Sequence, residues 1–334
     1  MDFNDNPSLN LSLYADNILH FDKGIFMNDS NQPGRFINKV LSNYWQESKA
    51  VKPTGNFNYQ GDVKLRVRLN QELYFAWGEM LERPYNKNIL KFYSYDNEFS
   101  PAKLVAAILE EYAQLPFVTR ERIFYKEVYK TLSRAIVDNN SKKNNVVVCK
   151  MVSGKMIKIY PVRICMDEWS THNYLTGLVL DNKSGELVPT SMRLSKIESI
   201  IETNDVSDEK GIFGDVGDKH IISHNEALKK YGVMFLNPQS KTVEAKIRFT
   251  ESGKNNYNVM SFMRPPYVKL QKCSNGGYDM IFNCTERQIM NYFRKFGNEI
   301  EVLEPRELRE EFKSFFAEAH EMYNNSKGNN DDNA

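Results

Sequence analysis

Three cations alternate with apolar residues in the segment 63–69, VKLRVRL. Successive side chains of an extended strand point to opposite faces, so this pattern places Lys64, Arg66 and Arg68 on one face and the apolar residues on the other. Three positive charges on one face can neutralise the phosphates of a nucleic acid. The alternative is a solvated strand whose charges prevent pairing with other chains.

A second group of cations is interleaved with aromatic rings in the segment that follows, residues 82–99. Its members are Arg83, Lys87 and Lys91 with Tyr85, Phe92, Tyr93 and Tyr95. Unstacked bases stack on aromatic rings whatever their sequence, and nearby cations neutralise the phosphates. The alternative is a packed insert in which the rings belong to the core.

Residue patterns typical of catalysis are missing from the sequence. It has no Gly-x-Ser-x-Gly elbow, no phosphate-binding loop and no His-Glu-x-x-His. His220 and His224 lack a third ligand and indicate surface or loop positions, and the pair Glu110 and Glu111 indicates an exposed helix face. We therefore expect no catalytic residue, no metal and no cofactor.

The four cysteines are spread along the chain, with no Cys-x-x-Cys pair and no histidine at ligand spacing. They are Cys149, Cys165, Cys273 and Cys284. We expect reduced thiols in a cytoplasmic protein, because the polar start of the chain does not resemble a signal peptide and no apolar stretch is long enough for a membrane span.

The bulk composition indicates an ordinary folded chain of two or three domains. Lys and Arg number 44 against 43 Asp and Glu, so a nucleic-acid surface must come from local separation of charge. The last segment, 326–334, is polar and low in complexity, which predicts a disordered tail.

A strand, helix, helix pattern occurs twice within residues 1–115. In the first copy a period-two segment at 9–13 precedes helical patterns at 18–26 and from Arg35, and in the second the segment 63–69 precedes two more. Pro33 and Pro101 suit the first position of the closing helix in each copy. Two such units can pair their strands antiparallel and share one core. This duplicated head resembles the ribbon-helix-helix fold of DNA-binding repressors, and Arg35 joins its candidate nucleic-acid contacts.

A helix predicted near Arg120 to Val137 lies in a linker, 116–142, and is followed by short β-branched segments over 143–205. A small β-barrel or curled sheet fits them. The segments KIYPVRI, NYLTGLV and MRLSKIESI resemble the WYL domain, an SH3-like or Sm-like barrel. Asn173 stands where that family has Trp, Ser195 where it has Asp and Lys196 where it has a second Arg.

The resemblance implies a sensor for nucleic acid or nucleotide-like ligands. Its binding residues would be Tyr174, Arg193 and Lys196, with Arg163 as a neighbour. Arginine offers a planar fork to phosphate, and tyrosine can stack on bases. The alternative is that Tyr174 belongs to the core and Arg193 pairs with a carboxylate.

A linker, 206–240, precedes alternating strand and helix patterns over 241–325, which predict a ferredoxin-like α+β fold. The ending RKFGNEIEVLEPRELREEF resembles the C-terminal extension that follows many WYL domains and implies a homodimer. The whole chain is therefore expected to be α+β, with a ribbon-helix-helix-like head, a WYL barrel and this extension.

The combination resembles the WYL accessory proteins of type VI-D CRISPR systems. The resemblance implies binding of single-stranded RNA and stimulation of the RNA-guided effector nuclease, in antiviral defence. The second hypothesis is a DNA-binding transcriptional regulator whose ribbon reads an operator and whose WYL domain senses nucleic acid. The preference for RNA or DNA stays open at this point.

Overall fold

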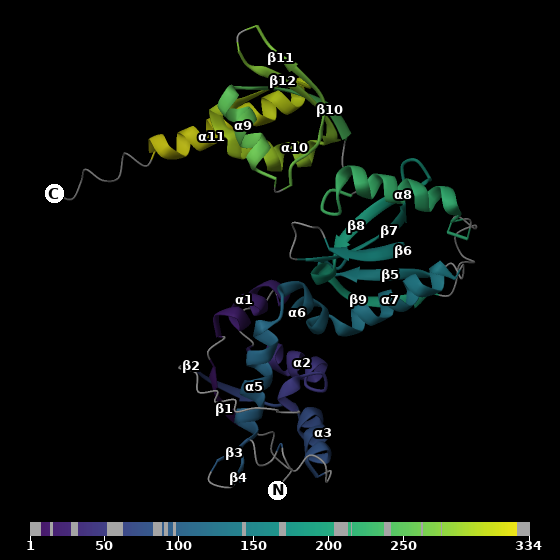
Figure 1. Cartoon of the computed structure of the whole chain (residues 1–334). Coiled ribbons are helices and arrows are strands. Elements are labelled where there is room, and N and C mark those ends of the chain that lie inside the picture. The colour runs from purple at the N-terminus through teal and green to yellow at the C-terminus, as the bar shows by residue number, and fades with distance from the viewer. Residues whose placement is uncertain are drawn as a thin grey trace, which may run out of the picture.

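The computed structural model describes residues 8–13, 16–27, 33–51, 63–82, 89, 93–95, 98–141, 145–166, 172–203, 213–214, 216–236, 242–261, 263–274 and 276–325. It is an α+β protein with separate antiparallel sheets. Figure 1 shows the head, a five-stranded sheet and a C-terminal part following one another along the molecule. No helix within these ranges is long and apolar enough to cross a membrane.

The two strands of the head pair with each other, as the repeat predicted. Strand β1 (Ser8–Leu13) runs antiparallel to β2 (Val63–Arg68), with Leu11 opposite Leu65. Val67 and Leu69 are buried, which confirms the apolar face of the second strand for these positions, and Leu11 of β1 is buried as well. The head also contains two short strands, β3 (Ser94–Tyr95) and β4 (Glu98–Phe99).

The helices of the head pack around this ribbon. They are α1 (Asp16–Phe26), α2 (Pro33–Tyr44), the short η1 (Lys49–Val51), α3 (Gln71–Glu82) and α5 (Pro101–Gln114). Helices α2 and α5 begin at Pro33 and Pro101, as predicted, because proline fits the first turn of a helix without losing a hydrogen bond. Their apolar faces are buried in one core with Trp45 and Trp77.

The helix expected over Arg120 to Val137 is two helices. Helix α6 (Phe117–Phe124) ends at Tyr125, whose φ of −100° and ψ of 32° interrupt the helix, and α7 (Lys126–Asn140) follows at once. The hydroxyl of Tyr125 donates to the carbonyl of Phe26, 2.9 Å away. The break therefore brings a buried tyrosine against the head.

Five strands form the central sheet in the order β8-β7-β6-β5-β9. They are β5 (Val146–Met151), β6 (Met156–Met166), β7 (Asn173–Leu180), β8 (Leu187–Arg193) and β9 (Ile197–Thr203). The closed barrel is not seen in the described residues, because β8 and β9 are opposite edges that do not pair. The short helix η3 (Leu194–Lys196) turns the chain between them, so Met192–Ile200 is not one strand.

Both faces of the central sheet are covered. One face shares the head's core through Ile159, Leu175 and Ile197, so head and sheet are packed as one body. Tyr160 and Leu178 belong to a smaller core on the other face. There lies α8 (Asp218–Tyr231), a helix in the segment taken as a linker, beside the central sheet (Figure 1). It contacts β8 of this sheet and β12 of the C-terminal part.

The C-terminal part has its own core and a four-stranded sheet in the order β11-β12-β10-β13. Its elements are β10 (Thr242–Phe249), α9 (Glu251–Val259), β11 (Tyr267–Lys272), β12 (Tyr278–Thr285), α10 (Glu286–Phe293), η5 (Arg294–Glu299), β13 (Ile300–Glu304) and α11 (Arg306–Asn325). Gly297 has φ of 54° and interrupts η5. The sequence patterns identified every strand and the last two α-helices but missed α9.

Candidate nucleic-acid interface

The central sheet brings three candidate residues to one face. Tyr174 lies between Cys165 of β6 and Arg193 of β8, and in the next row Thr176 pairs with Arg163. Residues two apart on a strand share a face, so Tyr174 and Thr176 lie on the side covered by α8. The opposite side belongs to the core shared with the head.

Tyr174 supports Arg193. The Nε of Arg193 donates to the hydroxyl of Tyr174 at 3.2 Å, and the guanidinium carbon lies 6.0 Å from the ring centroid. The tyrosine is only 4% exposed, so its ring presents no open platform to a base. Arg193, which is half-buried, carries the charge that a ligand would meet.

Arg163 is exposed and is held from α8. Its Nη2 donates to Oδ1 of Asn225 at 3.0 Å. The neighbouring His224 is completely buried, so the expected surface position is wrong for this histidine. Burial is the main cause that lowers the pKa of His224, the charge of Arg163 adds to it, and the contact with Asn225 opposes it. His224 is therefore neutral at neutral pH, because its ordinary value is 6.5.

Lys196 is separated from this row. It lies in η3, is exposed, and its carbonyl accepts a hydrogen bond from the backbone N of Val152 at 3.0 Å. The turn that separates β8 from β9 carries it away from the sheet. The sequence pattern predicted a continuous strand here, so it did not show that Lys196 lies away from the sheet.

In the head, Arg66 and Arg68 are exposed on β2, as predicted. The side chain of Lys64 lies outside those described. Asn38, which is 5% exposed, fixes the end of the ribbon: its Nδ2 donates to the carbonyl of Arg68 at 2.8 Å, and its Oδ1 accepts from the backbone N of Asn70 at 2.7 Å. This buried amide therefore fixes the backbone at the end of β2, the strand that carries the two arginines.

Arg35 is exposed on α2, one turn before Lys39. The Nζ of Lys39 lies 4.3 Å from the ring centroid of Phe124. The residue as a whole is exposed, but desolvation of its ammonium group, first, and then the charge of Arg35 lower the pKa of Lys39. The two cations therefore form a locally positive face of the head.

The aromatic loop of the second repeat falls largely outside the described residues, including Arg83, Lys87 and Lys91. Tyr93 is described, and at 2% exposure it belongs to the core. Its hydroxyl donates to the carbonyl of Ala50 at 2.9 Å. Tyr93 is therefore a core residue, as the alternative interpretation of this segment predicted, and is not an exposed platform for a base.

Glu110 and Glu111 do not form the exposed face that the sequence indicated. Glu110 is 5% exposed. Glu111 accepts hydrogen bonds from the hydroxyls of Tyr44 and Ser48 and from the backbone N of residues 49 and 50. Burial alone raises the pKa of Glu111, but these hydrogen bonds outweigh it and the pKa lies below its ordinary value. The carboxylate ties α2 and η1 to α5.

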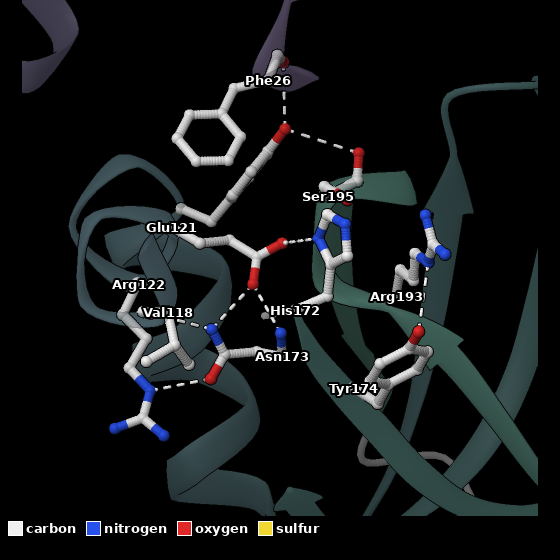
Figure 2. A network of polar contacts seen from close by, with 10 residues as sticks. Phe26, Val118, Glu121, Arg122, His172, Asn173, Tyr174, Arg193 and Ser195 are labelled. Carbon is white, nitrogen blue, oxygen red and sulfur yellow. Dashed lines mark hydrogen bonds and ion pairs between the residues drawn. The ribbon is translucent and has the colours of Figure 1, made fainter. Parts of the chain in front are cut away.

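A buried polar network joins α6 to the start of β7 (Figure 2). One carboxylate oxygen of Glu121 accepts from the backbone N of Asn173 at 2.5 Å and from its Nδ2 at 2.7 Å. The other lies 3.2 Å from Nδ1 of His172. Asn173 therefore binds α6, the helix that also contacts the head.

The residue before Glu121 points into the head. Arg120 donates from Nε to Asp22 at 2.6 Å and from Nη2 to the second oxygen at 3.0 Å, and both side chains are buried. Tyr112 donates to the same carboxylate at 3.2 Å. Helix α6 is therefore bound to the head and to the sheet through consecutive residues.

No protein-family model matches the chain. No curated protein matches its sequence. A solved structure described as "Crystal structure of a CRISPR Cas-related protein" superposes with a TM-score of 0.72 at 19% identity, covering 96% of this chain and 94% of that one. Proteasome accessory factor B/C (PafBC) of Arthrobacter aurescens matches with a TM-score of 0.30 at 13% identity, covering 78% of this chain and 37% of that one. Over nearly its whole length, the chain shares the fold of the CRISPR Cas-related protein.

Proposed function

We propose that this protein is a non-catalytic, cytoplasmic accessory that binds single-stranded RNA and enhances an RNA-guided CRISPR ribonuclease. The observation that carries the proposal is the face of the central sheet on which Tyr174 holds Arg193 beside the row of Arg163. Guanidinium groups fixed in this way suit phosphate, because their planar forks bind two oxygens at once.

The charge distribution supports binding through selected surfaces. The chain has a net charge of only +1, so long-range attraction is weak. Exposed cations nevertheless occur together on β2 (Arg66 and Arg68) and on α2 (Arg35 and Lys39). Single-stranded RNA can follow such separated contacts because its backbone is flexible.

The link to a CRISPR effector rests on two likenesses. The chain has the fold of the CRISPR Cas-related protein, and its segments resemble the WYL accessory proteins of type VI-D systems. On this basis we assign a ribbon-helix-helix-like head to residues 1–115, a WYL domain to 143–205 and a ferredoxin-like extension to 241–325. The order of strands in the last sheet supports that assignment.

We further propose a homodimer formed through the C-terminal part. Strand β11 is an edge of its sheet, and all six of its residues are exposed. Val268 is 70% exposed and Tyr267 46%. An uncovered edge strand with apolar side chains is suited to pairing with another chain, and a second copy offers the same strand.

The second candidate is a transcriptional regulator that binds duplex DNA. The paired strands β1 and β2, with Arg66 and Arg68 exposed, favour it. A two-stranded ribbon fits the major groove of B-DNA. In this case the sheet face with Arg163 and Arg193 would sense the signal and the head would read the operator.

Competition binding at one salt concentration separates the two candidates, since phosphate contacts make affinity depend on salt. A labelled, unstructured RNA is competed with unlabelled RNA, single-stranded DNA and duplex DNA. The accessory proposal predicts that RNA competes best and that the protein accelerates target cleavage by a type VI-D effector. Strong preference for one duplex sequence, with no effect on cleavage, supports the regulator instead.

A further inference from the structure

Arg122 is held in one orientation at the boundary between α6 and the central sheet. Its Nε donates to Oδ1 of Asn173 at 2.8 Å. Its guanidinium carbon lies 5.2 Å from the ring centroid of Tyr129, on the next helix. A hydrogen bond to Nε and an aromatic ring beside the guanidinium restrict the torsions of this side chain, which is otherwise flexible.

The acceptor for Arg122 is itself fixed. Asn173 is completely buried, and its Nδ2 donates to the carbonyl of Val118 at 2.9 Å and to Glu121 at 2.7 Å. Both N–H bonds of the amide are used, so rotation of the amide would cost both contacts. Its Oδ1 must therefore face Arg122, as Figure 2 shows.

The charge of Arg122 is not neutralised by the network. Glu121 is bound to Asn173 and His172, and within the described parts of the chain Arg122 forms no ion pair with a carboxylate. In Figure 2 its two terminal nitrogens point away from the network. The side chain is half-buried, so these nitrogens carry a charge at the surface.

We propose that Arg122 is a preorganised binding fork for a phosphate of the single-stranded RNA backbone, at the junction of head and sheet. Both Nη groups can donate to two oxygens of one phosphate while Nε stays bound to Asn173. Since the side chain is already ordered, little conformational entropy is lost on binding. The inference rests on the proposed function and names a contact for it.

The position of the fork is also rigid. The two residues that precede it, Arg120 and Glu121, bind the head and the sheet respectively. A phosphate held here would lie at the junction between the two parts of the molecule. RNA bound across the junction would therefore contact Arg122 whichever of the two parts binds first.

The test compares wild type, Arg122→Gln and Arg122→Lys for binding to a uridine 20-mer over a range of salt concentrations. Arg287→Gln is the matched control, because Arg287 is an exposed arginine on α10 and its loss changes the net charge equally. We expect Arg122→Gln to bind roughly tenfold more weakly and its salt slope to fall by about 0.7, the value of one phosphate contact in a single strand. The lysine variant should keep the slope and lose affinity, because it lacks the fork.

A second variant, Tyr129→Leu, removes the ring. It should weaken RNA binding when introduced alone, and it should have no further effect when it is combined with Arg122→Gln. If wild type binds RNA and Arg122→Gln behaves like Arg287→Gln, the fork is disproved while the proposed function stands. If wild type does not bind RNA, the proposed function fails, and inorganic tripolyphosphate is titrated while the Nε–H NMR signal of Arg122 is followed. A shift of that signal supports the fork, and an unchanged signal overturns it.

Discussion

The backbone N and the side-chain amide of Asn173 both donate to one carboxylate oxygen of Glu121, at 2.5 and 2.7 Å. Both residues are fully buried. Since α6 also binds the head, this pair connects the central sheet to the head. A buried carboxylate that loses its donors keeps the full cost of leaving water.

Replacement of Asn173 by Ala should therefore lower the free energy of unfolding by about 2–3 kcal/mol. The measurement is urea unfolding monitored by circular dichroism. Asn255→Ala is the control, because Asn255 is exposed on α9. The control should change stability by less than about 0.5 kcal/mol. Equal effects of the two variants would show that the network does not stabilise the junction.

The ion pair of Arg120 and Asp22 connects α6 to the head, and its removal is a second test of how α6 holds the two parts together. In Asp22→Ala the guanidinium stays buried without its carboxylate, so we expect a loss of about 3–5 kcal/mol. Trp45 and Trp77 are both buried in the head, which makes tryptophan fluorescence a suitable probe. The exposed pair of Lys150 and Glu198 provides the control, and Glu198→Ala should cost less than about 1 kcal/mol.

His224 predicts a pH dependence. Burial lowers its pKa below 6.5, so the unfolded chain binds a proton at a higher pH than the folded one does. Stability should fall as pH drops below 6.5 and level off below the folded pKa. The loss between pH 7 and pH 5 should be smaller in His224→Leu than in wild type, with the exposed His320→Leu as control. An identical pH dependence in all three proteins would contradict the assignment.

Removal of one hydroxyl tests the support of Arg193. Tyr174→Phe keeps the ring but loses the acceptor for Nε, so Arg193 should be less ordered. We expect affinity for single-stranded RNA to fall about threefold to fivefold, the loss that one hydrogen bond of about 1 kcal/mol implies. Fluorescence anisotropy measures it, and Tyr323→Phe, whose ring is 80% exposed, should bind like wild type.

The sequence predicted those parts of the fold that follow from local periodicity. The alternation in VKLRVRL gave the exposed side chains of Arg66 and Arg68, and the repeated strand gave the pairing of β1 with β2. The short β-branched segments over 143–205 also placed Tyr174 and Arg193 on strands, and these strands are neighbours in the sheet. Each of these features depends on only a few consecutive residues.

Features that depend on tertiary contacts were missed or wrong. Glu111 looks like a solvated residue because its four donors come from residues 44–50, far away in sequence. Helix α9 contains Gly253 and three asparagines, which are poor helix formers. It forms because Thr250 caps it and because glycine allows close packing: a Cβ at Gly253 would lie 2.4 Å from the carbonyl oxygen of Glu299.

The site was predictable only in part for the same reason. Arg163, Tyr174 and Arg193 were identified by resemblance, whereas Asn225 lies on a helix that the patterns did not reveal. Arg122 and Asn173 are 51 positions apart, and no local spacing connects them. Their hydrogen bond could therefore be identified only from the three-dimensional structure.

The most direct test of the central proposal is the salt dependence of uridine 20-mer binding in wild type and in the double variant Arg163→Gln, Arg193→Gln. If both arginines contact phosphates of single-stranded RNA, the slope of log affinity against log salt should fall by about 1.4, since each contact contributes about 0.7. An unchanged slope and affinity in the double variant would contradict the proposal that this face of the sheet binds RNA.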